Sequence, residues 1–225
     1  MAQKTRVTIL DDHQSIIDGY LYRLKDVPQI EVVAALSFGE ELEPSLTSTP
    51  SDVLLLDVSV PTSVDNPNPY PILYSIPDLL NRFFHLSILV ITMHNEGGLV
   101  RAVMETGASG YVFKDDQMLI RDLGNVVLSV ASGGIVLSQQ AHRLLRQHEH
   151  TTDDQPLSSR QLEALSLCGS YPDWSTAELS RRMSITNSTA RNLLSSAYLR
   201  LGVHTRFAAV AKARQMGILT PLHQA

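Results

Sequence analysis

The sequence contains one cysteine, Cys168, and no apolar run that approaches the length of a membrane span. A single cysteine excludes a disulfide bond within the chain, in agreement with a reducing interior. The N-terminal residues "MAQKTRVTIL" lack the long apolar segment of a secretory signal. We therefore expect a soluble, cytoplasmic protein that has no membrane partner.

Internal repeats and low-complexity tracts are also lacking, and 44% apolar residues are enough for ordinary folded cores. The length of 225 residues suits two domains. Residues 1–130 carry a net charge of −9, residues 131–155 carry −1 and residues 156–225 carry +5. This difference indicates two functions, the second on a polyanion, although chance variation in surface charge would give the same asymmetry.

Apolar strands alternate with amphipathic helical stretches over the first 130 residues. Such alternation predicts an α/β fold, a five-stranded doubly wound parallel sheet with helices on both faces. Five strands suit the flavodoxin-like strand order. The predicted strands are 6–10, 30–36, 52–57, 87–92 and 110–113, and the predicted helices lie near 14–26, 39–48, 72–84, 96–106 and 117–131.

From Leu157 onwards the pattern changes to short helices, which predicts a second, all-α domain of four helices. "SSRQ" (158–161) and "STAE" (175–178) fit capping boxes for the first two helices. A third helix is expected from Thr186 to Leu201, and a fourth from about His204 to Met216. We divide the chain into a first domain at 1–131, a partly helical linker at 132–155 and a second domain at 156–225.

Polar side chains end several predicted strands. Strand ends carry Asp11, Asp12, Asp57, Thr92 and Lys114. Ligands of a doubly wound sheet bind outside the carboxyl ends of its strands, so these side chains should lie close together. Three neighbouring carboxylates need a cation, and Mg²⁺ prefers a few carboxylates plus waters. Because lysine and hydroxyl groups suit phosphoryl oxygens, Asp57 can act as a nucleophile toward a phosphoryl group.

These residues stand in motifs that resemble the receiver domain of bacterial two-component response regulators. The motifs are "LDD" (10–12), "LLLDVSVP" (54–61), "VITMH" (90–94) and "GASGYVFK" (107–114), and the resemblance covers residues 5–131. It implies that Asp57 is the phosphoacceptor for a sensor histidine kinase, with Thr92 and Lys114 as phosphoryl ligands. Thr92 and Tyr111 would form the switch. The implied Mg²⁺ ligands are Asp11, Asp12, Asp57 and the backbone carbonyl of Ser59.

Two other interpretations of the first domain are compatible with an Asp after an apolar strand. Aspartyl-phosphate hydrolases of the haloacid-dehalogenase type also place a nucleophilic Asp after an apolar strand. They need a second Asp two residues on, where this chain has Ser59. We therefore expect no enzyme, only self-phosphorylation and slow self-dephosphorylation at Asp57. The alternative that stays open is a DNA-binding regulator whose receiver is a ligand-sensing or docking module and never sees phosphate.

The segment after Pro61, "TSVDNPNPYPILYSIP", departs from the receiver pattern by being longer than usual. Five of the eleven prolines fall between 61 and 77. Each removes a backbone donor and restricts its predecessor, so we expect no helix before roughly Ile72. A tolerated surface insertion is the favoured interpretation. The other interpretation is altered access of water or the kinase to Asp57.

Residues 157–219 resemble the LuxR-type helix-turn-helix domain of NarL/FixJ-class regulators. "LSSRQLEAL", "AELSRRM", "TNSTARN" and "LRLGVHTRFAAV" lie in family order, with a two-residue insertion in "SYPDW" (170–174). Ser188 and Leu193 stand where Lys and His are common, which weakens the basic character of the reading helix. Target sequence and affinity are therefore left open.

The resemblance implies double-stranded DNA as a ligand and places the third helix in the major groove. The candidate base-reading residues are Asn187, Ser188, Arg191, Asn192 and Ser195, and the candidate phosphate contacts are Thr189, Arg200, Thr205 and Arg206. It further implies RNA polymerase as a partner and a homodimer in the active state, formed through the last helix at 205–217. Phosphorylation at Asp57 would free or dimerise a second domain that is otherwise masked or monomeric.

Overall fold

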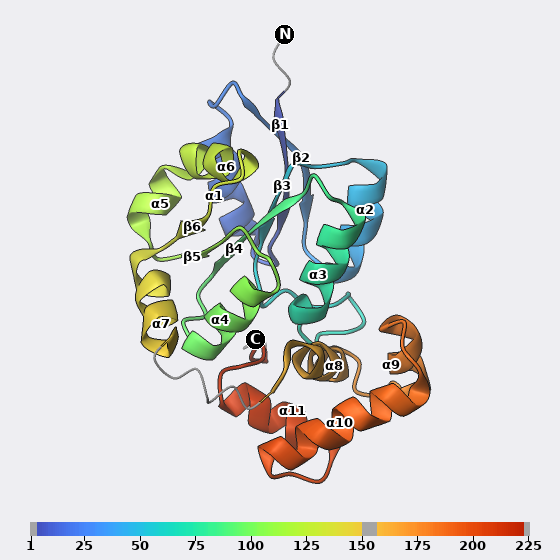
Figure 1. Ribbon diagram of the computed structural model, residues 1–225. Coiled ribbons are helices and arrows are strands. Elements are labelled where there is room, and N and C mark those ends of the chain that lie inside the picture. The colour runs from blue at the N-terminus through green and yellow to red at the C-terminus, as the bar shows by residue number, and fades with distance from the viewer. Residues whose placement is uncertain (1–3, 150–156, 223–225) are drawn as a thin grey trace.

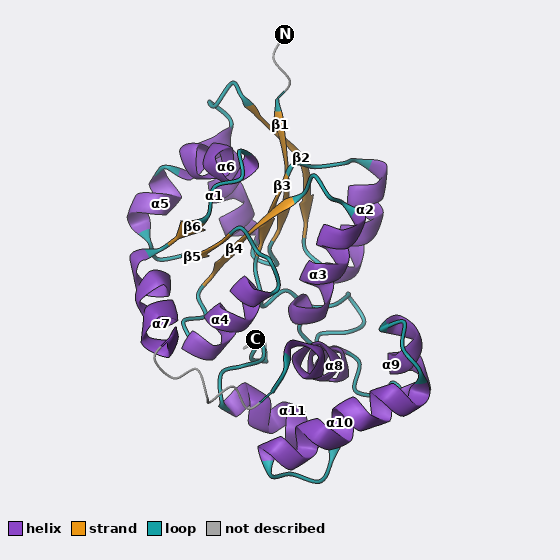
Figure 2. Cartoon of the chain, in the orientation of Figure 1, coloured by secondary structure: helices purple, strands orange, loops and turns teal. Residues whose placement is uncertain are grey.

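The computed structural model describes residues 4–149 and 157–222. Figure 1 shows an α/β part that contains the sheet and, below it, a part built from α8 to α11. Figure 2 shows strands in the first part and helices and loops in the second. The predicted boundary at 155/156 lies outside the described residues. Within the described residues, no helix has both the length and the apolar character needed to cross a bilayer.

A parallel sheet with strand order β2-β1-β3-β4-β5-β6 forms the centre of the first part. Its first five strands confirm the predicted strands and the flavodoxin-like order. The sixth strand corrects the predicted five-stranded sheet, and it lies in the segment that we had interpreted as linker. The strands are β1 (Thr5–Leu10), β2 (Ile30–Leu36), β3 (Val53–Leu56), β4 (Ser87–Thr92), β5 (Gly110–Phe113) and β6 (Val136–Leu137).

The sixth strand was missed because two residues are too few to show an alternating pattern. It pairs with β5, where Gly110 lies opposite Val136. A Cβ on Gly110 would come within 2.2 Å of the carbonyl oxygen of Val136, so only glycine allows this approach.

Helices cover both faces of the sheet, as predicted. The helix expected at 117–131 is divided in two, because Asp122 leaves the helical region with φ −97° and ψ 25°. The helices of this part are α1 (Gln14–Leu24), the 3₁₀ turn η1 (Gly39–Glu41), α2 (Leu42–Ser48), α3 (Ile72–Arg82), α4 (Gly97–Glu105), α5 (Gln117–Arg121), α6 (Leu123–Ala131) and α7 (Gln139–Glu149). The last of these, α7, packs against α4.

Successive side chains of the buried strands supply two apolar cores. Val53 and Leu55 of β3 pack with α1 and α6 on one face of the sheet. Leu54 and Leu56 pack with α2, α3 and α4 on the other face. This second core continues without a break into the helical part, so the two parts share apolar packing.

The second part contains α8 (Ser159–Ser170), α9 (Thr176–Arg182), α10 (Asn187–Leu201) and α11 (Arg206–Gln215). Both predicted capping boxes are present, at Ser158 and Ser175. Thr186 caps α10, and Gly202 ends it in the left-handed conformation with φ 66°. The four predicted helices are therefore confirmed, and the third and fourth, whose two ends were predicted, agree within two residues.

Candidate functional site

The carboxyl ends of β1, β3 and β5 bring two aspartates and one lysine together. The Nζ atom of Lys114 lies 2.7 Å from Oδ2 of Asp11 and 2.8 Å from Oδ2 of Asp57. All three side chains are at most 9% exposed. The parallel sheet places these residues at one edge, since each directly follows a strand.

Burial and charge act in opposite directions in this cluster. Burial would lower the pKa of Lys114, but the carboxylates of Asp57 and Asp11 outweigh it and raise that pKa, so the ammonium stays charged. Burial, with the nearby Asp57, raises the pKa of Asp11 although Lys114 opposes the change. The carboxylates of Asp11 and Asp57 therefore carry more negative charge than the single positive charge of Lys114 neutralises.

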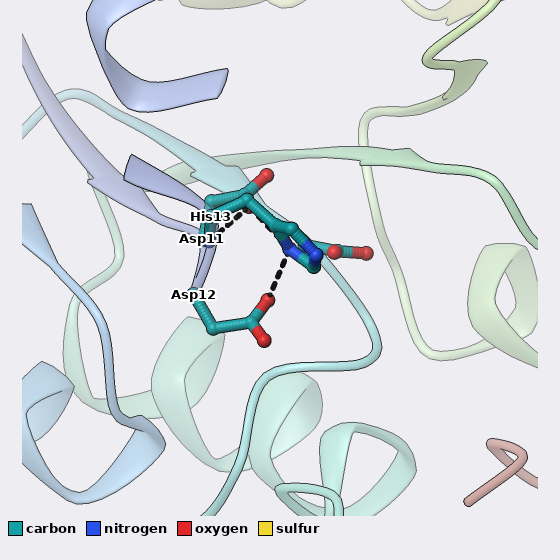
Figure 3. A group of neighbouring side chains, drawn as sticks. Asp11, Asp12 and His13 are labelled. Atoms are coloured by element: carbon teal, nitrogen blue, oxygen red, sulfur yellow. Dashed lines mark hydrogen bonds and ion pairs between the residues drawn. The ribbon is translucent and has the colours of Figure 1, made fainter. Parts of the chain in front are cut away.

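Asp12 and His13 complete the cluster on the side of β1. Ligand atoms of Asp11, Asp12, His13 and Asp57 all lie within 4.8 Å of one another. Figure 3 shows the His13 imidazole turned toward Asp12, and the Nδ1 of His13 lies 2.9 Å from Oδ1 of Asp12. This arrangement is an acidic group that could bind a metal ion.

A hard cation fits the donor set that is present. Oδ2 of Asp11 is buried and forms no hydrogen bond of regular geometry within the described residues, although Lys114 forms an ion pair with it. Carboxylate oxygens are the preferred ligands of Mg²⁺. The buried atom therefore has capacity for a further positive partner.

Three further predicted residues belong to β4, to β5 and to the loop after β3. Thr92, at the end of β4, is fully buried, and its hydroxyl accepts a hydrogen bond from the backbone of His94 at 3.4 Å. Tyr111 is also fully buried, and its hydroxyl donates to the carbonyl of His94 at 2.8 Å. The predicted carbonyl ligand, Ser59, follows Asp57, and its N–H donates to Oδ1 of Asp57 at 3.4 Å.

One hydrogen bond beside Asp57 was not predicted from the sequence. The hydroxyl of Ser59 and the Nε2 of His94 form a short hydrogen bond that joins the loops after β3 and β4. On its other side, the Nδ1 of His94 lies 3.7 Å from Glu96. His94 stood in the quoted motif "VITMH", but no residue nearby in sequence indicated that it would meet Ser59.

The candidate base-reading residues lie on α10, together with the candidate phosphate contact Thr189. Ser188, Thr189, Arg191, Asn192 and Ser195 are exposed, and Asn187 is half-buried. The hydroxyl of Thr189 is close to that of Thr186, at 2.8 Å. The receiver does not cover this face, so these side chains are accessible in the conformation that the structure describes (Figure 1).

Some candidate phosphate contacts are exposed to solvent, and one already forms hydrogen bonds within the protein. Arg200 and Thr205 are exposed, and Thr205 also caps α11 through the N–H of Ala208. Arg206 is half-buried, and its guanidinium donates to the carbonyl of Trp174 and to the hydroxyl of Thr176. Only its remaining N–H groups could reach a phosphate.

The sheet order, the acid cluster with its lysine and the following helix-turn-helix together match the architecture of two-domain response regulators. Comparisons with known proteins agree with this class. The transcriptional regulatory protein DegU of Brevibacillus brevis is 26% identical, and the match covers 95% of this chain and 94% of that protein. The DNA-binding transcriptional activator DevR/DosR of Mycobacterium tuberculosis is 25% identical, with 94% of each chain covered.

Solved structures show the same fold. RcsB from Salmonella enterica serovar Typhimurium, bound to promoter rprA in the presence of phosphomimetic BeF₃⁻, gives a TM-score of 0.64 at 24% identity. That match covers 93% of this chain and 98% of RcsB. No family model matches the chain. The chain nevertheless resembles response regulators of the NarL/FixJ class over nearly its whole length, with a receiver domain followed by a helix-turn-helix domain.

Proposed function

We propose that this protein is a phosphorylation-dependent, DNA-binding transcription regulator of a two-component system, and that Asp57 accepts the phosphoryl group from a sensor histidine kinase. The observation that carries this proposal is the pair of short contacts from Lys114 to Asp57 and Asp11. They place a fixed positive charge beside a carboxylate at the ligand-binding edge of the sheet. A receiver that never sees phosphate is not favoured, because this cluster would then have no chemical use.

In the proposed transfer, a carboxylate oxygen of Asp57 attacks the phosphorus of a phosphohistidine, and the P–N bond breaks. Lys114 stabilises negative charge on the phosphoryl oxygens, and the Thr92 hydroxyl donates to one of them. Asp11, Asp12, Asp57 and the carbonyl of Ser59 would hold Mg²⁺. When bound, Mg²⁺ supplies further charge neutralisation at the phosphoryl group.

The proposed output is DNA binding by α10. Arg191 can read guanine through two hydrogen bonds, and Asn187 or Asn192 can read adenine. Arg200 and Thr205 would contact phosphates. We propose a homodimer through α11 as the active state, and RNA polymerase as a further partner of the DNA-bound protein. Two-fold symmetry would then match an inverted repeat.

Intact-protein mass measurement after incubation with acetyl phosphate and Mg²⁺ tests the phosphoacceptor. We expect the wild type to gain one phosphoryl group and Asp57→Asn to gain none. Asp65→Asn, in an exposed loop of the same domain, is the matched control and should be labelled like the wild type. Equal labelling of Asp57→Asn would contradict the assignment.

Duplexes selected from a random DNA library by the phosphorylated protein test the output. We expect these duplexes to bind phosphorylated wild type more tightly than Asp57→Asn, and binding to weaken steeply as salt increases. Equal affinity of the two proteins would exclude phosphorylation control. A flat salt response would indicate that the helical domain does not bind DNA through phosphate contacts.

A further inference from the structure

The two segments at which the chain departs from its family pattern contact each other. One is the proline-rich loop, residues 61–71 between β3 and α3, and the other is the "SYPDW" segment, residues 170–174 between α8 and α9. The Nδ2 of Asn66 donates to the carbonyl of Ser170 at 2.9 Å. The hydroxyl of Ser170 donates to the carbonyl of Pro69 at 2.5 Å. Two insertions from different domains therefore form one contact.

The proline-rich loop is held in shape by its own hydrogen bonds. Pro61 and Pro69 form an antiparallel bridge, and the N–H and hydroxyl of Thr62 both donate to the carbonyl of Asn68 at 2.8 Å. The N–H of Gly39 donates to the carbonyl of Pro61 at 2.9 Å. These bonds restrain the loop without any group of the second domain, which reduces the entropy cost of the contact.

Asn66 is oriented within this loop. Its Oδ1 accepts hydrogen bonds from the backbone and side-chain amides of Asn68, at 3.2 and 2.8 Å. The Nδ2 is therefore left to donate outward, to Ser170. Ser170 is the last residue of α8, whose final carbonyls have no partner inside the helix. Asn66 thus caps a helix of the other domain.

Residues of α3 and α9 add further contacts between the two parts of the molecule, beside the contact of the proline-rich loop with Ser170. The hydroxyl of Tyr74 donates to the carbonyl of Arg182 at 2.7 Å, and the Arg182 guanidinium lies 5.2 Å from the centre of the Tyr74 ring. Arg182 also lies 3.8 Å from Glu43 of α2. Polar side chains therefore make these contacts between the two parts, and the shared apolar core lies beneath them.

We propose that the proline-rich loop is an interdomain latch, which caps the C-terminus of α8 and holds the helix-turn-helix domain against the receiver while the reading face of α10 stays exposed. The loop begins four residues after Asp57, so a change in the backbone around Asp57 would displace the start of the loop. That consequence for signalling rests on the proposed function. The latch itself does not, since its hydrogen bonds are made by residues of this chain alone.

Hydrogen exchange followed by mass spectrometry tests the latch without a phosphoryl donor. Asn66→Asp keeps the size of the side chain and its acceptor oxygen but cannot donate to Ser170. Ser170→Ala removes the second bond from the other domain. We expect each variant to accelerate exchange about fivefold in residues 61–74 and 166–174, because one hydrogen bond is lost from the closed state. Emission of Trp174, the sole tryptophan, should shift to longer wavelength in the double variant.

Asp65→Asn, one residue away and exposed, is the control and should exchange like the wild type. Unchanged exchange in both Asn66→Asp and Ser170→Ala would overturn the latch. Acceleration that extends equally to β1 and β3 would also overturn it, because the two bonds would then support only global stability. Failure of Asp57 to accept a phosphoryl group would leave these outcomes unaffected, so the two proposals can fail separately.

Discussion

The Nζ of Lys114 lies 2.8 Å from the Oδ2 of Asp57, and both side chains are almost completely buried. Removing one partner of a buried pair leaves the other charge without compensation. We expect Lys114→Met to lower the free energy of unfolding by about 3 kcal/mol and to prevent labelling of Asp57 by acetyl phosphate. Chemical denaturation and intact-mass measurement check the two effects.

Lys4→Met, at an exposed position, is the control for Lys114→Met and should alter neither quantity. Added Mg²⁺ should recover part of the lost stability in Lys114→Met, since a cation can replace some of the missing positive charge. A variant as stable as the wild type would mean that the lysine contributes little to the cluster.

The raised pKa of Asp11 predicts that its charge opposes folding at neutral pH. The folded state holds this proton to higher pH than the unfolded chain does, so the favourable contribution exists below about 3.8 and is lost as pH rises through the folded pKa. Asp11→Asn should therefore stabilise the metal-free protein at pH 7, by about 1 kcal/mol or 2–4 °C in Tm. Stabilisation by Mg²⁺ should weaken in the same variant. A fall in Tm without Mg²⁺ would contradict the direction of the shift.

The hydrogen bond between Ser59 and His94 joins the two loops beside Asp57, whose side chain is only 4% exposed. Breaking it should allow these loops to open more often. We expect His94→Ala to raise the rate of Asp57 labelling by acetyl phosphate about threefold to tenfold, the range of one hydrogen bond. His85→Ala, at an exposed position, should match the wild type. Slower labelling would show that the imidazole assists the transfer.

Gly39 lies directly beneath the ring of Tyr70, and a Cβ there would come within 2.1 Å of that ring. Gly39→Ala should therefore displace Tyr70 and lower the free energy of unfolding by about 1–3 kcal/mol. Gly19→Ala in α1 is the control, and we expect it to change the free energy of unfolding in the opposite direction. Its nearest neighbour is the end of the flexible Arg23 side chain at 3.4 Å, so helix propensity should raise stability by up to about 1 kcal/mol. Thermal denaturation of both variants measures the contrast.

Tyr171 and Trp174 stack with ring centroids 4.0 Å apart. Burial and the receiver residue Glu40 raise the pKa of Tyr171 to about 12. The pKa of Tyr171 in the folded protein exceeds the ordinary value of 10. The neutral phenol therefore contributes to the stability of the folded state below pH 10, and this contribution is lost as pH rises through about 12. Tyrosinate should quench Trp174 with a midpoint near 12 in rapid pH jumps. Tyr171→Phe should remove this transition, and a midpoint near 10 would show that neither burial nor Glu40 raises the pKa of Tyr171 in solution.

The first five strands of the sheet and the acid cluster could be predicted because they depend on local patterns. Val53 to Leu56 form a fully buried run, and Asp57 directly follows it. Once strand and helix alternate, a doubly wound order is one of few arrangements, and it brings the strand ends together. Capping residues such as Ser158 and Thr186 marked helix starts for the same local reason.

The amino-acid sequence by itself determined the strand and helix types, the flavodoxin-like order and the meeting of Asp11, Asp57 and Lys114, because periodicity and strand ends act over short distances. Only the tertiary structure decided that Ser59 would bond His94 and that Asn66 would cap Ser170, 104 residues further along the chain. Such contacts need two backbones placed to within a fraction of an ångström. That placement comes from the packing of whole helices and sheets, and no local pattern encodes it.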